Sequence, residues 1–578
     1  MSCTALAVGP VTLHTAIMDE RIGPRAWRES YAHPCDWQQD FAPLAMPQMF
    51  AGSVAAYGER VLADFLGRTF TYRQIDAEAR RFACGLQSLG LGKGDRIGLF
   101  LPNVPCYLSA YFGAFMAGVT VVNFSPLYTA TELEAQVADS GARLLVTLDV
   151  PALLPTACKV HRESALEWLV VARLSSMLPF WKSLGLRLLR RKDIAAIPRE
   201  EGVFEFTDVL HEGDLAPVDI EPMTDLAMLQ YTGGTTGTPK GAMLTHQNLT
   251  VNARQIEEID PHAHARDVIV GVLPFFHVFA NATVLNRTVY DGGTIAMLPR
   301  FDAGQCLATL QRVKATAMPG VPTMYQALLD HPDMARTDFS SLFTCISGGA
   351  PLPGPVKARF EQASGATLVE GYGLTEAAGV VATNPFDGPE RPGTIGHPMP
   401  GTDLRLLDKD DPTRAAASGE PGELAINGPQ VMAGYWNRPE AASAVFVELE
   451  GKRWLRTGDI ATIDEDGYVH LIDRSKDMIA VGGFKVFPSQ VEEILLANPA
   501  VREAMVLGVP DEYHGEVPRA YVVAESGEAA SAEDIAAWLN ERVGKHERVD
   551  KVVLRDSLPK TMVGKLDRKA LRAEVLGK

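Results

Sequence analysis

The sequence predicts an α/β protein. A large N-terminal domain is expected to hold two parallel-sheet α/β subdomains and a small β-rich subdomain, followed by a small α+β C-terminal domain. The chain has 578 residues, which is too long for a single hydrophobic core. Helix-like and strand-like segments alternate over much of the chain, which is typical of βαβ units and parallel sheets. Short segments rich in glycine and proline, such as residues 396–407, then replace this alternation.

The alternating segments form two sets. The first set extends from about residue 47 to 217. It contains helix-like residues 71–89, strand-like residues 96–101 and a second unit that ends in the apolar run 118–123. The second set extends from residue 226 to about 384. Each set is expected to form one parallel sheet with its helices.

The C-terminal domain is expected to begin after a charged cluster at residues 473–477, which ends an apolar strand-like run. The predicted domains are therefore residues 1–473 and 474–578. In the second of these, residues 531–543 begin with a serine and two acids and continue with helical apolar spacing. About 100 residues are enough for a compact small domain.

Composition excludes several classes of protein. The net charge of −17 argues against a nucleic acid partner. The seven cysteines are scattered without C-x-x-C spacing, which argues against a zinc site and a disulfide framework and suits a reducing compartment. No basic-then-apolar leader and no run of 18 apolar residues is found, so we expect a cytoplasmic protein without a membrane span.

The run YTGGTTGTPKG at residues 231–241 carries the strongest functional signal. Glycines allow backbone N–H groups to converge on an anion, threonine hydroxyls add donors, and a lysine adds positive charge. The run is not a P-loop of the nucleoside-triphosphatase type, because Pro239 and Gly241 flank Lys240 where Gly and Ser/Thr would be needed. We predict phosphate contacts from Thr232, Gly233, Gly234, Thr235, Gly237, Thr238 and Lys240.

Five further motifs follow in order: 344–351 (TCISGGAP), 370–376 (EGYGLTE), 454–459 (WLRTGD), 473–477 (DRSKD) and 559–565 (PKTMVGK). Together with the loop at 231–241 they resemble the motif set of the adenylate-forming enzymes, which include acyl-CoA synthetases, adenylation domains of peptide synthetases and beetle luciferases. The chain most resembles the medium- and long-chain fatty acyl-CoA synthetases. The resemblance implies ATP, Mg²⁺ and CoA as ligands and a mobile C-terminal domain.

The resemblance also implies residue roles. Lys565 would bridge the carboxylate and the α-phosphate, and Glu376 would bind Mg²⁺ with Thr236 or Thr375. Asp459 and Arg474 would hold the ribose, and Lys476 would be the hinge. The other implied nucleotide contacts are Gly349, Ala350, Pro351, Glu370, Gly371, Tyr372 and Gly373. The two implied CoA contacts are Gly483 and Lys485.

The substrate is expected to be a medium- or long-chain fatty acid. In the family that the chain resembles, His277 borders the acyl pocket at the start of an apolar helical stretch. Asn281, Asn286 and Arg287 interrupt that stretch, so a dicarboxylic acid stays open as an alternative, although helical spacing places Arg287 away from the face of His277. Another alternative is an acyl-AMP ligase that loads a carrier protein.

A membrane surface and a lysine acetyltransferase are two further candidate partners. Residues 178–192 mix apolar, aromatic and basic side chains at helical spacing. Such a segment could rest on an anionic membrane surface, at the inner face of the membrane, or could be a helix docked on its own domain. Acetylation of Lys565 by a lysine acetyltransferase would remove the charge that the family mechanism needs. A non-catalytic nucleotide sensor is disfavoured because both Lys565 and Glu376 are present.

Overall fold

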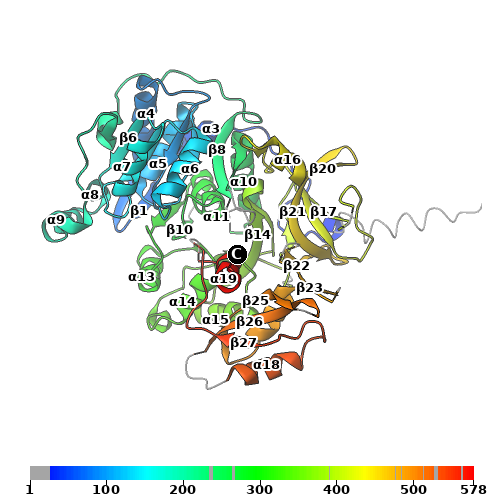
Figure 1. Ribbon diagram of the computed structural model, residues 1–578. Coiled ribbons are helices and arrows are strands. Elements are labelled where there is room, and N and C mark those ends of the chain that lie inside the picture. Colours follow the sequence, from blue (N-terminus) through cyan, green and yellow to red (C-terminus); the bar gives the residue numbers. More distant parts are fainter. Residues whose placement is uncertain are drawn as a thin grey trace, which may run out of the picture.

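Figure 1 shows a computed structural model of the chain, in which four β-sheets carry the architecture. The residues that the structure describes are 27–232, 239–262, 267–388, 391–409, 411–474, 477–482, 484–511, 513–525, 531–561 and 564–577.

The largest sheet has nine strands and is parallel in its centre, with antiparallel pairs at both edges. In spatial order its strands are β16 (His397–Pro398), β15 (Gly379–Thr383), β14 (Thr367–Leu374), β13 (Thr344–Gly348), β12 (Ala317–Gly320), β10 (Val268–Gly271), β11 (Thr294–Met297), β1 (Val61–Phe65) and β2 (Arg68–Thr71).

The second sheet has eight strands and is again parallel except at one edge. Its strands in spatial order are β19 (Gly434–Tyr435), β9 (Lys240–Thr245), β8 (Leu226–Thr232), β4 (Thr120–Asn123), β3 (Arg96–Leu99), β5 (Leu144–Leu148), β6 (Trp168–Ala172) and β7 (Val203–Glu205).

The α/β prediction is confirmed, but the division into two consecutive sets is wrong in one respect, because each sheet takes strands from both sets. Strand β1 pairs with β11, and β8 pairs with β4. The sequence pattern shows which segments are strands, whereas partner choice depends on contacts between residues far apart in the chain.

The helices alternate with these strands as expected. Helix α4 shows why its boundary was predictable: Thr71 caps it, accepting a hydrogen bond from the Gln74 N–H. In chain order the N-terminal helices are α2 (Trp27–Ser30), α3 (Met46–Tyr57), α4 (Tyr72–Ser88), α5 (Pro105–Met116), α6 (Ala130–Ser140), α7 (Leu154–Glu163), α8 (Leu174–Met177), α9 (Phe180–Leu189), α10 (His246–Glu258), α11 (Val278–Ala280), the π-helical η3 (Asn281–Asn286), α12 (Arg287–Asp291), α13 (Ala303–Val313), α14 (Pro322–Leu329), α15 (Gly354–Ser364) and α16 (Pro439–Val445).

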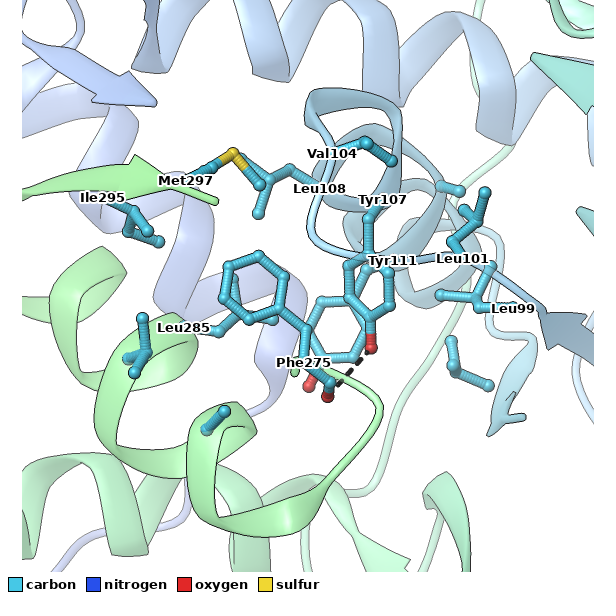
Figure 2. Close-up of a cluster of buried hydrophobic side chains, with 14 of the residues drawn as sticks. Leu99, Leu101, Val104, Tyr107, Leu108, Tyr111, Phe275, Leu285, Ile295 and Met297 are labelled. Atoms are coloured by element: carbon cyan, nitrogen blue, oxygen red, sulfur yellow. Dashed lines mark hydrogen bonds between the residues drawn. The ribbon is translucent and has the colours of Figure 1, made fainter. Parts of the chain in front are cut away.

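Helix α5 joins the two sheets into one core. All twelve of its residues are buried, so it is apolar on every side. Figure 2 shows Tyr107 and Tyr111 of this helix between Leu99, which ends β3 of one sheet, and Met297, which ends β11 of the other. The Tyr107 hydroxyl donates a 3.3 Å hydrogen bond to the Phe275 carbonyl, so the polar end of this ring is paired inside the core.

A third, antiparallel sheet forms the β-rich part of the molecule, drawn in yellow in Figure 1. Its strands are β17 (Asp403–Leu407), β18 (Gly422–Asn427), β21 (Lys452–Ile463), β20 (Phe446–Leu449) and β22 (Val469–Arg474). Strands β21 and β22 place Asp459 opposite Arg474 in the register.

The fourth sheet contains the C-terminal strands, with their own small hydrophobic core. Its elements are β23 (Ile479–Val481), β24 (Phe484–Val486), α17 (Pro488–Leu496), β25 (Val501–Asp511), β26 (Gly515–Ala524), α18 (Ala532–Asn540), β27 (Val552–Leu554) and α19 (Arg568–Leu576). This unit, orange to red in Figure 1, lies beside α14 and α15. Arg502 of β25 forms a 2.8 Å ion pair with Asp330, directly after α14.

Candidate active site

The predicted phosphate loop connects β8 to β9 in an antiparallel hairpin. Its two described ends, Thr232 and Lys240, face each other in the register. A P-loop would instead lead from a strand into a helix, so the hairpin agrees with the exclusion made from the sequence. The other predicted loop residues lie outside the described residues and their roles stay predictions: Gly233, Gly234, Thr235, Thr236, Gly237 and Thr238.

Lys240 and Glu376 both contact Tyr435, one at the ring face and the other at the hydroxyl. The Lys240 ammonium lies 5.1 Å from the ring centre of Tyr435, which is a cation–π distance. The Tyr435 hydroxyl donates a 2.7 Å hydrogen bond to Glu376 Oε1. Burial, and then the Glu376 charge, raises the pKa of Tyr435, so the hydroxyl keeps its proton and stays a donor. Tyr435 was missed in the sequence because no family motif covers it and a lone tyrosine carries no signal.

Tyr372, Asp459 and Arg474 form a second cluster from three strands. The Tyr372 hydroxyl donates a 2.5 Å hydrogen bond to Asp459 Oδ2, and Arg474 Nε lies 3.2 Å from Asp459 Oδ1. Both carboxylate oxygens of Asp459 are thus held in a fixed orientation, and carboxylate oxygens are acceptors for hydroxyl groups. Burial, and then Asp459, raises the pKa of Tyr372 well above its usual range.

Gly373, an implied nucleotide contact, packs closely against the neighbouring strand. A Cβ on Gly373 would lie 1.9 Å from the Gly379 carbonyl oxygen of β15. The glycine is thus required by close strand packing, whatever binds Tyr372.

Glu370 fixes the turn that follows β13. Its carboxylate accepts a 3.2 Å hydrogen bond from the Leu352 N–H, and so ties down the turn that contains the predicted nucleotide contacts Gly349, Ala350 and Pro351. Burial, and then the charge of Glu493 on α17, raises the pKa of Glu370 to about 8. Gly371, next in the chain, packs in β14 against Ile346.

Lys565 reaches this turn from the C-terminal unit. A Cβ on Gly349 would lie 2.0 Å from Lys565 Cε and 2.2 Å from its Nζ, so the lysine occupies the space that a side chain would take. The preceding residue, Gly564, accepts a 2.6 Å hydrogen bond from the Thr323 hydroxyl of α14. Desolvation, and then the Arg474 charge, lowers the pKa of Lys565 to about 8. Thr323 was missed because it lies in no motif and acts on a backbone carbonyl.

His277 lies close enough to Lys565 for their charges to interact. Its Nδ1 caps α11 by accepting from the Phe279 N–H at 3.3 Å. Desolvation, and then Lys565, lowers the pKa of His277 to about 3, so the ring is neutral at physiological pH. His277 therefore lies at the start of the apolar helix and within electrostatic range of Lys565, while its place beside an acyl pocket stays a prediction.

Asn281, Asn286 and Arg287 interrupt that helical stretch, and all three are buried. Arg287 is already paired with three carboxylates. Its guanidinium contacts Glu257 at 3.0 Å and Asp260 at 2.8 Å, and it also pairs with Asp267. A buried cation with three carboxylates has no free charge for a distal substrate carboxylate. Asn281 Oδ1 accepts from Asn286 at 2.9 Å and from Tyr111 at 3.2 Å, so both asparagines belong to one internal network.

An apolar cavity of about 40 Å³ lies between α10, η3 and strands β10, β12, β13 and β15. Ile346 of β13 and Thr283 of η3 line it, together with Arg287 and Asp260. Ligand pockets are usually several hundred Å³. The cavity in this structure is therefore too small to hold a fatty acyl chain.

The predicted hinge residue is Lys476, and the two predicted CoA contacts are Gly483 and Lys485. Lys476 and Gly483 lie outside the described residues, so the hinge and this CoA contact stay predictions. Lys485 lies on β24 with an exposed side chain, and it forms no hydrogen bond or ion pair with any residue that the structure describes.

The residues present fit the expected ligands. Lys240 and Lys565 supply positive charge, and the Asp459 cluster offers acceptors for ribose hydroxyls. Over the described residues, no group of three or more His, Cys, Asp or Glu could hold a metal ion. Glu376, with Thr375 next to it, nevertheless suits Mg²⁺, which keeps several waters and is usually bound by one or two carboxylates together with substrate phosphates.

Comparisons with known proteins agree with this geometry. Residues 50–436 match the profile of the AMP-binding enzymes, and residues 490–565 match that of the AMP-binding enzyme C-terminal domain. The chain is 36% identical over 555 residues to a long-chain-fatty-acid–CoA ligase of Bacillus subtilis (strain 168), covering 95% of this chain and 98% of the relative. It is 37% identical over 567 residues to the enzyme of that name from Escherichia coli O157:H7, covering 96% and 99%.

Among solved structures, ATP-bound MatB from Rhodopseudomonas palustris superposes with a TM-score of 0.80 at 28% identity, covering 93% of this chain and 100% of that chain. The fold, the clustered motifs and a profile match over more than half of the residues lead to one assignment: the chain belongs to the family of AMP-binding enzymes.

Proposed function

We propose that this chain is an ATP-dependent fatty acid–CoA ligase. It activates a medium- or long-chain fatty acid as the acyl-adenylate, releases pyrophosphate, and transfers the acyl group to CoA. The observation that carries the proposal is the position of Lys565, which extends from the C-terminal unit against Gly349 and close to His277. The nearly full-length match to long-chain-fatty-acid–CoA ligases supports the class of acid.

In the first half-reaction a carboxylate oxygen of the fatty acid attacks the α-phosphorus of ATP, and the bond to pyrophosphate breaks. The reacting oxygens are all negative, so the site must supply cations. Protonated Lys565 would lie between the carboxylate and the α-phosphate, and Lys240 would hold the outer phosphates. Mg²⁺ held by Glu376, with Thr236 or Thr375, would neutralise phosphate charge and orient the leaving pyrophosphate.

The nucleoside would be held by the second cluster. Asp459 would accept hydrogen bonds from the two ribose hydroxyls, while Tyr372 and Arg474 keep its carboxylate in a fixed orientation. The turn at Gly349, Ala350 and Pro351 would pack beside adenine. The role of Glu370 would be to hold that turn through the Leu352 N–H.

In the second half-reaction the CoA thiol sulfur attacks the acyl carbonyl carbon, AMP leaves, and the thiol proton passes to water. Lys565 must first leave the site to let CoA approach. We propose that residues 474–578 rotate as a domain relative to residues 1–473 about a hinge at Lys476. The Thr323–Gly564 and Asp330–Arg502 contacts would then break, and Gly483 and Lys485 would contribute to the CoA path.

Because Arg287 is already paired with buried carboxylates, it offers no charge to a second substrate carboxylate, which favours a monocarboxylic acid over the dicarboxylate alternative. Purified protein should be assayed for CoA-dependent AMP release across straight-chain monocarboxylic, dicarboxylic and aromatic acids. We expect a maximum among medium or long monocarboxylic acids. A dicarboxylate maximum would refute the assigned substrate. Pyrophosphate release without CoA consumption on every acid would instead indicate a ligase that loads a carrier protein.

The role of Lys565 has its own test. Lys565→Ala should lose acyl-adenylate formation and retain ATP binding. Lys560→Ala is a matched control from the same loop, because Lys560 pairs with Glu503 at 2.7 Å. Unchanged turnover in Lys565→Ala would refute the role of this lysine.

We also propose that acetylation of Lys565 silences the first half-reaction, since it removes the ammonium charge. The lysine is partly buried against Gly349 in this conformation, so a modifying enzyme would need the rotated one. Protein with acetyl-lysine installed at position 565 should lose pyrophosphate exchange and keep thioester formation from preformed acyl-adenylate. Normal exchange would contradict this proposal.

A peripheral contact with a lipid surface is the last part of the proposal. Over the described residues, the structure contains no helix with the length and apolar character needed to cross a membrane. A fatty acid substrate partitions into lipid, so contact with a lipid surface would bring the enzyme to its substrate.

A further inference from the structure

Helix α9 carries an unusual concentration of exposed apolar side chains. Across the described residues, eleven large apolar side chains are exposed, and five of them lie within this ten-residue helix. Their exposed fractions are 71% for Phe180, 78% for Trp181, 38% for Leu184, 60% for Leu188 and 87% for Leu189. Isolated exposed apolar residues are ordinary, but a contiguous group marks an interaction surface.

Four of the five exposed apolar residues of α9 share one face, and Leu189, at the end of the helix, lies outside it. At 100° per residue, Phe180, Trp181, Leu184 and Leu188 fall within an arc of about 100°. Leu186, on the opposite side, is the buried residue of the helix and packs on the protein core. The apolar arc thus points outward, and Figure 1 shows α9 projecting from the edge of the molecule.

The helix is held in this orientation from its inner side. Lys182 donates a 2.9 Å hydrogen bond to the Leu66 carbonyl, and Arg187 donates a 3.2 Å hydrogen bond to the Ser175 hydroxyl. Phe180 and Trp181 pack edge to face with ring centres 5.0 Å apart, which makes them one aromatic pair at the start of the helix. The outward face is therefore fixed by contacts with neighbouring segments.

The charge around α9 is opposite to that of the molecule. Residues 180–192 contain five Lys or Arg and no Asp or Glu, while the whole chain has a net charge of −17. Arg187 borders the apolar arc, whereas Lys182 lies nearer the buried side of the helix. Arg190, which pairs with Asp193, and Lys192 are exposed just beyond the helix. Apolar and aromatic residues bordered by basic ones are typical of helices that lie in the interface of an anionic bilayer.

We propose that α9 is a docking surface for an anionic phospholipid bilayer. Phe180, Trp181, Leu184 and Leu188 enter the boundary between headgroups and acyl chains, and the basic residues contact lipid phosphates. A second copy of the chain is a poorer occupant. A ten-residue helix is about 15 Å long and about 10 Å wide, which is far below the roughly 800 Å² per partner of a stable interface.

This docking rests on the lipid contact proposed above and assigns it to one surface, while vesicle binding can be measured whether or not the ligase activity holds. It predicts that the enzyme collects its substrate where fatty acids partition. Binding should depend both on insertion of apolar side chains and on charge attraction to anionic lipids. Neutral vesicles and high salt should therefore both weaken binding.

The test is vesicle flotation with the full-length protein, using phosphatidylcholine vesicles with and without 30% phosphatidylglycerol. The triple variant Phe180→Ser, Trp181→Ser and Leu188→Ser should lose at least tenfold in partitioning to anionic vesicles. The matched control replaces three exposed apolar residues elsewhere: Met223→Ser, Phe343→Ser and Leu554→Ser. The control should bind as the wild type does, and all three proteins should release AMP equally with a water-soluble medium-chain acid in the absence of vesicles.

Arg190→Gln with Lys192→Gln should weaken binding to anionic vesicles at least threefold and leave binding to neutral vesicles unchanged. Equal binding of the wild type to neutral and anionic vesicles would overturn the proposal, as would unchanged binding of the triple variant. A concentration-dependent dimer that the triple variant abolishes in the absence of lipid would assign α9 to a second copy instead.

Discussion

Gly349→Ala tests whether the lysine position in this structure is the one that performs adenylation. A Cβ at this position would lie 2.0 Å from Lys565 Cε and 2.2 Å from Nζ, whereas nonbonded carbon atoms approach to about 3.5 Å. The lysine end would have to move by more than 1 Å. Gly349 also has φ +84°, so alanine adds strain of about 1–2 kcal/mol.

A displacement of 1 Å in a reacting group can cost about 10²-fold in rate. We therefore expect ATP–pyrophosphate exchange to fall at least about 100-fold in Gly349→Ala. Thioester formation from preformed acyl-adenylate and CoA should remain within threefold of the wild type, because the proposed mechanism has Lys565 leave the site before that step. The control is Gly354→Ala at the start of α15, where a Cβ meets nothing within 4 Å.

If Gly349→Ala protein melts as the wild type does and exchanges pyrophosphate at a normal rate, then the position of Lys565 beside Gly349 is not the one that performs adenylation. Equal loss of both half-reactions would also count against this role of the position, since a general distortion of the nucleotide site would slow both. Only selective loss of the first half-reaction assigns the effect to the contact between Gly349 and Lys565.

Three other predictions follow from the same contacts. Thr323→Val removes the hydrogen bond to Gly564, so pyrophosphate exchange should fall about fivefold, equivalent to about 1 kcal/mol, with thioester formation from acyl-adenylate unchanged; equal slowing of both steps would contradict this. The kcat/KM of adenylation should fall as pH rises through about 8, where Lys565 loses its proton. In Lys565→Arg this fall in kcat/KM should occur only above pH 10, because arginine keeps its proton. A fall that stays near pH 8 in Lys565→Arg would mean that another group, such as Glu370, causes it. Arg287→Met leaves three carboxylates unpaired and should cost about 3–5 kcal/mol in urea unfolding at pH 7; a loss below 1 kcal/mol would show that water reaches the cluster.

The motifs and the type of most elements could be predicted from the sequence, because both depend on local spacing. The cap of Ser531 on α18 and the strand that ends at Thr232 are of this kind. The pairing of β1 with β11 could not be predicted, since no local pattern specifies a strand partner more than 200 residues away.

The site itself divides in the same way. Lys565 and Asp459 lie in motifs and could be named, whereas Tyr435 and Thr323 act through single contacts that only the fold creates. The sequence showed that Arg287 interrupts an apolar helix. Three acids from two other segments neutralise this arginine, and only the tertiary structure shows this pairing.

The lowered pKa of Lys565 connects the two half-reactions. Desolvation makes the charged lysine less stable in this site than in water, so the empty site weakly opposes the closed position. In the proposed mechanism, ATP phosphates and the fatty acid carboxylate would reverse that balance, which would couple substrate binding to closure. When pyrophosphate leaves, most of the negative charge near Lys565 would leave with it, and the desolvation cost would again be poorly compensated. The same buried position that would make the lysine effective in the first half-reaction would therefore favour its departure before the second.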